Sequence, residues 1–181
     1  MDHDPKNVGP LESFFREAVH ESLVGRLGLS DADDLENYLA CLLGTFLHNE
    51  AIFAIRDAQG RPVETIAEML AEGDVRLNAD SFERERAVHR HLGDFLLFWS
   101  GIFPEALSRI NGLGGSTPIE GAIRLGRYSY SVVGSFDHPP FDREAPTFQK
   151  LSRWFEACRD GLTLVRRQFS GLPKLGDPRG A

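Results

Sequence analysis

The stretch that decides the fold is residues 81–103, which read SFERERAVHRHLGDFLLFWSGIF. Ser81 is placed to cap the N-terminus of a helix, because its side chain can accept a hydrogen bond from a backbone N–H of the first turn. The first half of the stretch is apolar along one stripe, whereas the second half, 95–103, is apolar nearly all round. This pattern predicts a central helix whose second half is covered by its neighbours.

Further helical segments flank the central one, and apolar residues at helical spacing mark them. Thr117-Pro-Ile-Glu120 is the clearest start, since it combines a capping box with proline at the first helical position. The spacings of the last segment alternate between four and three, as in the seam of a left-handed bundle. The expected helices are 11–27, about 34–55, a short helix opened by Pro62, 81–103 with a restart at Pro104, 117–136 and 145–169.

These segments predict an all-α fold, an irregular bundle of about six helices. The length of 181 residues suits one domain. We expect that domain to span residues 10–170, with disordered tails at 1–9 and 171–181 that are rich in proline, glycine and charge.

Charge and hydropathy narrow the classes of partner. The net charge of −7 argues against binding nucleic acid or an anionic membrane, which needs a positive field. The acidic start, Met-Asp-His-Asp-Pro, is unlike a secretory signal. The apolar run at 95–103 is far shorter than the roughly twenty residues that span a bilayer. We therefore expect a cytoplasmic protein with no membrane and no nucleic-acid partner.

Few residues have the spacing of a metal or redox site. Cys41 and Cys158 lie far apart within helical patterns, and we expect both to be buried, unbridged and unreactive. Glu17 and His20 form a single E-x-x-H pair, whereas di-iron bundles need two such motifs and two further carboxylates. We therefore interpret this pair as a solvated helix flank.

The central helix carries a second weak metal pattern. His91 and Asp94 share a helix face, but His89 points about 160° away from His91, so the two histidines cannot grip one ion together. Two ligands on one helix are a fragment of a site. We expect no metal and no cofactor.

A glycine-rich loop, Gly112-Leu-Gly-Gly-Ser-Thr-Pro118, precedes the helix at 117–136. Such a loop can cradle phosphate through backbone N–H groups. No strand precedes it and no lysine follows, so neither the Walker nor the dinucleotide pattern is met. We interpret it as a link that ends in a helix cap.

Asp94 is the most informative polar residue, because it precedes a helix half that the apolar pattern predicts to be covered on all sides. A buried carboxylate is costly unless it is paired. Arg90 on the same helix, an arginine or N–H from another helix, or a ligand in a pocket would satisfy it. Our hypothesis places Asp94 between the central helix and 117–136, held by Arg127 with Tyr130 or His91 nearby.

Three segments carry a resemblance: Gly93-Asp94, Gly101-Ile-Phe-Pro-Glu105 and Gly126-Arg-Tyr-Ser-Tyr130, followed by the apolar stripe of the last helix. In this order they resemble segments of a group of bacterial helical proteins with no established activity. The resemblance covers about the second half of the chain. It implies a bacterial, helical, cytosolic protein and draws attention to Asp94, Glu105, Arg127 and Tyr130.

Two functions of different classes follow. The first is a non-enzymatic interaction or regulatory module that binds a protein partner in a groove between helices. The alternative is a small-ligand- or metal-binding bundle, or an enzyme, whose site lies between the helices at 81–103 and 117–136. Its binding residues would be His91, Asp94, Glu105, Arg127 and Tyr130. No motif assigns a catalytic residue or a reaction, and the sequence leaves the oligomeric state open.

Overall fold

The computed structural model describes residues 10–30, 32–46, 65–74, 77, 79–110 and 112–168, and all regular structure within these ranges is helical. The elements are α1 (Pro10–His20), the π-helix η1 (Glu21–Arg26), α2 (Asp33–Phe46), α3 (Ile66–Gly73), α4 (Phe82–Ile102), the 3-10 helix η3 (Pro104–Arg109), α5 (Pro118–Gly134), α6 (Ala145–Arg153) and α7 (Phe155–Gln168). The all-α prediction is confirmed. The expected tails at 1–9 and 171–181 lie outside the described residues.

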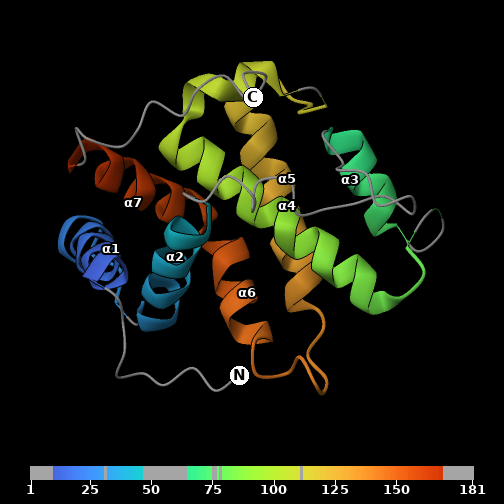
Figure 1. Cartoon of the computed structure of the whole chain (residues 1–181), viewed down its shortest axis with the longest axis horizontal. Coiled ribbons are helices and arrows are strands. Elements are labelled where there is room, and N and C mark those ends of the chain that lie inside the picture. Colours follow the sequence, from blue (N-terminus) through green and yellow to red (C-terminus); the bar gives the residue numbers. More distant parts are fainter. Residues whose placement is uncertain are drawn as a thin grey trace.

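Helix α4 runs through the centre of the molecule, with α5 crossing it (Figure 1). It packs against α5, α7 and α3, and every residue from Phe95 to Ile102 is buried. This is the all-round covering that its apolar second half predicts. No described helix combines the length and apolar content needed to cross a bilayer.

Side-chain caps set the starts of three helices. The Ser81 hydroxyl accepts a hydrogen bond from the Arg84 N–H at 3.1 Å, and Thr117 accepts from the Glu120 N–H at 3.2 Å. Helix α3 begins after Thr65 with a complete capping box to Glu68, which corrects the start expected at Pro62. The signal for this start is Thr65-Ile-Ala-Glu68. Pro62 and residues 47–55, the expected end of the second helix, lie outside the described residues.

The last predicted helix is two helices, because the chain bends at Trp154 (Figure 1). Helical hydrogen bonds continue on both sides of the bend: the Trp154 N–H donates to the Lys150 carbonyl, and the Cys158 N–H donates to the Trp154 carbonyl. The apolar spacing therefore continues unchanged across the bend. Phe155 then packs on Gly126 of α5, where a Cβ would lie 2.4 Å from its ring.

Cys158 is fully buried, but Cys41 is exposed. The prediction for Cys41 was wrong because the buried stripe of α2 passes to either side of it, through Ala40 and Leu42. The helix turns about 100° per residue, so a residue between two buried neighbours can still face solvent. Both thiols are free.

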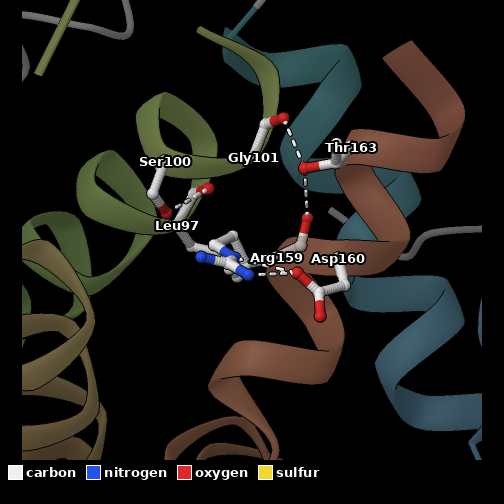
Figure 2. A network of polar contacts seen from close by, with 6 residues as sticks. All are labelled: Leu97, Ser100, Gly101, Arg159, Asp160 and Thr163. Carbon is white, nitrogen blue, oxygen red and sulfur yellow. Dashed lines mark hydrogen bonds and ion pairs between the residues drawn. The ribbon is translucent and has the colours of Figure 1, made fainter. Parts of the chain in front are cut away.

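Polar groups join α4 to α7 at the end of the central helix (Figure 2). The Thr163 hydroxyl points at the Gly101 carbonyl, at 3.0 Å, and also lies 3.1 Å from the Arg159 carbonyl. Gly101 belongs to the last turn of α4, whose carbonyls have no partner within the helix. Thr163 therefore satisfies one of these carbonyls from the neighbouring helix.

Candidate functional site

Asp94 lies where α2, α4 and α5 meet, and two tyrosines hold it. Its Oδ1 accepts hydrogen bonds from the Tyr38 hydroxyl of α2 at 2.6 Å and from the Tyr130 hydroxyl of α5 at 2.8 Å. We call these three residues the Asp94 cluster. A carboxylate oxygen with two short hydroxyl donors is well satisfied without a ligand.

Gly93 and Phe148 position the two tyrosines. A Cβ on Gly93 would lie 2.7 Å from the Tyr130 ring, so glycine lets this ring rest on the α4 backbone, with its hydroxyl at the neighbouring Asp94. The Phe148 ring of α6 packs against Tyr38 and Tyr130, with centroid distances of 5.3 and 5.8 Å. Tyr130 is fully buried, whereas Tyr38 and Asp94 are partly buried. The Asp94 cluster is thus packed between three helices and closed by α6.

Burial dominates the electrostatics of the cluster. Removal from water raises the pKa of Asp94 to about 6, although the two tyrosine hydroxyls and the charge of Arg90 act in the opposite direction. Burial, together with the nearby Asp94 charge, raises the pKa of both tyrosines well above its usual value. The tyrosines therefore remain hydrogen-bond donors at any physiological pH.

Two arginines of α4 border the cluster and share one carboxylate. The Arg86 Nη2 donates to the Glu144 carboxylate at 2.6 Å, and the Arg90 Nη1 lies 3.5 Å from the same oxygen. The Arg90 guanidinium carbon also lies 5.3 Å from the Phe148 ring centroid. Among the described residues Arg90 forms an ion pair with Glu144 and none with Asp94, the partner that one alternative gave it, although its charge still lowers the pKa of Asp94.

The structure brings Tyr130 to Asp94 but not Arg127, so this part of our hypothesis is corrected. Arg127 lies on the exposed side of α5, and its Nη1 is 3.8 Å from the Glu156 carboxylate of α7. On a helical wheel Arg127 and Tyr130 are about 60° apart, enough for one to face solvent while the other faces the core. The hypothesis named Tyr130 as a neighbour of Asp94 and Arg127 as its partner, whereas the hydroxyls of Tyr130 and Tyr38 are the partners.

The other two predicted binding residues lie in separate environments. The His91 ring stacks on Phe46 of α2, with ring centroids 6.0 Å apart. Glu105 in η3 is exposed and accepts two hydrogen bonds of 2.9 Å from the Arg166 guanidinium of α7. These bonds hold the pKa of Glu105 below its usual value. Glu105 therefore fastens η3 to α7.

A Ser–His contact between α4 and α5 was not predicted from the sequence. The His89 Nδ1 lies 3.5 Å from the Ser129 hydroxyl of α5, and the charge of Asp74 acts on the same ring. Burial lowers the pKa of His89, and Ser129 is fully buried. The three residues are of the types found in a catalytic triad. A catalytic serine must contact its substrate, however, and the buried Ser129 hydroxyl is closed to one.

Metal ligation finds no support within the described ranges, where no group of three His, Cys, Asp or Glu side chains is placed to hold an ion. The His20 of the E-x-x-H pair meets Glu36 instead, with its Nδ1 2.9 Å from the carboxylate. His89 and His91 face different helices, as their spacing predicts.

A shallow depression of about 500 Å³ is lined by the glycine-rich loop, 112–118, and by Leu107, Ser108 and Ile110 at the end of η3. The helix N-terminus beside it is already occupied, because Glu120 accepts a hydrogen bond from the Ser116 hydroxyl and its own N–H bonds to Thr117. The Glu120 carboxylate would repel a phosphate there. The interpretation of the loop as a link and a helix cap agrees with this geometry.

A second depression, about 470 Å³ in volume, lies between α5 and α6. We call it the α5–α6 groove. Its lining residues are polar, basic or glycine: Arg127, Ser131, Gly134, Ser135, Gln149, Ser152 and Arg153. Two exposed aromatic residues, Tyr128 and Trp154, follow its two arginines in sequence, and their exposed fractions are 55% and 44%.

The chain matches no protein-family model, no curated protein and no solved structure. Its candidate sites are therefore argued from geometry and chemistry alone. The resemblance of its second half to a group of bacterial helical proteins stays a prediction.

Proposed function

We propose that the chain is a non-enzymatic interaction module that binds a protein partner through the exposed side of α5 and the adjoining end of α6. The observation that carries the proposal is that an exposed aromatic residue directly follows each groove arginine in the sequence, Tyr128 after Arg127 and Trp154 after Arg153. Arginine, tyrosine and tryptophan are enriched at protein interfaces and among the residues that dominate their binding energy.

The elements bring these pairs to one side of the molecule. The Ser152 hydroxyl of α6 donates to the Arg127 carbonyl at 2.8 Å, and Glu156 of α7 lies beside the Arg127 side chain. The end of α6 and the start of α7 are therefore next to the middle of α5. Tyr128 marks the other edge of this exposed side, because its ring meets His89 of α4 at a centroid distance of 5.6 Å.

The contents of the Asp94 cluster support this proposal over the small-ligand alternative. That alternative needs polar groups between α4 and α5 that are open to a ligand. Asp94 instead has two tyrosine donors, and neither described depression includes it. On the resemblance of its second half, we place the module in the bacterial cytosol.

Photo-crosslinking in the native host tests the proposal. Tyr128 is replaced by p-benzoylphenylalanine, and a matched control carries the same residue at Phe82, which is 66% exposed at the start of α4. We expect a discrete protein adduct from position 128 that excess unmodified protein suppresses, and no such adduct from position 82.

Equal adducts from both positions, or none from position 128, would contradict the proposal. Native mass spectrometry and metal analysis of the purified chain test the ligand-binding alternative. A stoichiometric small molecule or metal ion would favour the ligand-binding alternative.

A further inference from the structure

We infer that the α5–α6 groove takes an acidic peptide segment of the partner; this inference rests on the proposed function and adds the chemistry of what is bound. The first observation is charge. Arg127 and Arg153 line the groove, and none of the seven lining residues is acidic, in a chain of net charge −7. A local positive site on an acidic protein favours a negatively charged partner.

The guanidinium groups of Arg127 and Arg153 can both bind an incoming carboxylate. Arg127 lies 3.8 Å from Glu156, too far for a direct hydrogen bond, and both side chains are at least half exposed. Such a surface pair is weak, so an incoming carboxylate can replace Glu156 at little cost. For Arg153, no ion pair or hydrogen bond of its side chain is recorded within the described part of the chain. Each arginine can bind a carboxylate through two N–H groups.

The hydroxyl groups distinguish a peptide from a free anion. Ser131, Ser135 and Ser152 each donate their proton to a main-chain carbonyl, of Tyr128, Val132 and Arg127 respectively. The serine oxygens therefore offer lone pairs to the groove, and these accept N–H groups. A peptide brings both carboxylates and N–H groups, whereas phosphate at neutral pH brings mainly acceptors.

The end of α5 strengthens this distinction. Gly134 is its last residue, and the C-terminus of a helix carries a partial negative charge. The Gly134 carbonyl already accepts a hydrogen bond from the Gln149 side chain at 2.9 Å, and the Val132 carbonyl accepts the Ser135 hydroxyl. The groove is therefore positive near its arginines and offers the lone pairs of the Ser135 oxygen at its other end. An extended peptide can place acidic side chains at the first end and main-chain N–H groups at the second.

The test is an NMR titration of the ¹⁵N-labelled full chain with an acetylated and amidated hexaglutamate peptide. We expect chemical-shift changes at residues 127–135 and 149–153. We expect binding at least about tenfold weaker in the double variant Arg127→Gln/Arg153→Gln, because two charged contacts are lost. Arg109→Gln removes one positive charge at an exposed position of η3, and this control should bind as wild type does.

A second variant changes affinity in the opposite direction. Glu156→Gln removes the carboxylate that competes for Arg127, so hexaglutamate should bind about two- to threefold more tightly. This variant guards against misreading a folding defect, because poor folding does not raise affinity. Circular dichroism confirms the fold of each variant.

The inference is overturned if the shifts map elsewhere, if Arg109→Gln weakens binding as much as the double variant, or if inorganic phosphate at equal ionic strength causes the same shifts. These outcomes leave the interaction function standing when the crosslink at position 128 persists. Loss of that crosslink in wild-type protein contradicts the interaction function itself.

Discussion

Two neighbouring residues of α4, Gly93 and Asp94, act on one side chain of α5. Gly93 makes room for the Tyr130 ring, and Asp94 accepts the Tyr130 hydroxyl. The Gly-Asp pair is thus a packing device, in which the first residue sets the distance between two helices and the second fixes the depth of the tyrosine.

Gly93→Ala should destabilise the protein by about 1–3 kcal/mol, because the new methyl group enters the space of the Tyr130 ring and the surrounding core must shift. Chemical denaturation measures the loss. Gly44→Ala in α2 is the control, since no described atom lies within 4 Å of its added Cβ. That control should be neutral or stabilising by up to about 1 kcal/mol. Equal stability of the two variants would refute the role of Gly93.

Asp94 also predicts a pH dependence. Its pKa is about 6 when folded and near 3.8 when unfolded, so the native state binds the proton more tightly between these values. The free energy of unfolding therefore falls as pH rises from about 4 to 6, and the contribution of Asp94 to this fall is about 3 kcal/mol.

The variant Asp94→Asn isolates this contribution, because its amide oxygen can still accept both tyrosine hydroxyls but has no charge. We expect the stability of Asp94→Asn relative to wild type to improve by up to about 3 kcal/mol between pH 4 and pH 7 in denaturation experiments. The opposing effect of His89, whose pKa is lowered, cancels in this comparison. A difference that does not change with pH would contradict the account.

At the scale of the elements, the two cysteines report which sides of α2 and α7 are buried. Cys158 is buried in the core, which raises its pKa to about 12, whereas Cys41 is exposed. A thiol-reactive dye should therefore label Cys41 of the native protein rapidly and Cys158 only after unfolding. The variant Cys41→Ser serves as the control and should label slowly. Rapid labelling of that variant would show that α7 is packed differently.

The helices themselves could be predicted wherever a local signal exists. Ser81 and Thr117 are capping residues that mark the starts of their helices, and apolar periodicity marks the buried stripes. The bend at Trp154 escaped prediction because the spacing of apolar residues is the same on both sides of it. Cys41 escaped because its class, a small apolar residue inside a helical pattern, does not fix its angle on the helix.

At the scale of the whole molecule, α4 is central because neighbours cover every side of its second half, and its sequence predicts this directly. Contacts between distant segments could not be predicted in this way. Tyr38 and Asp94 are 56 residues apart, and periodicity shows only that each lies near a buried stripe. Arg127 was matched to Asp94 on charge alone, although a 60° turn of α5 separates it from the core.

The cluster that stabilises the fold and the surface proposed for binding lie in different parts of the molecule. The Asp94 cluster fastens α2, α4 and α5, and the α5–α6 groove with its exposed aromatic neighbours is the surface that we propose for binding. Since Arg127 pairs with Glu156 and not with Asp94, the stability effects of Asp94→Asn and Arg127→Met should add within about 0.5 kcal/mol. Coupling above about 1 kcal/mol in this double-mutant cycle would contradict the separation.

The most direct test of the separation is the yield of the crosslink at position 128, compared between two variants at equal expression. With Asp94→Asn we expect a yield within about twofold of wild type, because the change is remote from the binding surface. With Arg127→Gln/Arg153→Gln we expect it to fall by about tenfold or more, because both cationic groups of the groove are lost. The reverse result, loss with Asp94→Asn and retention with the double variant, would place the function at the Asp94 cluster and contradict the account.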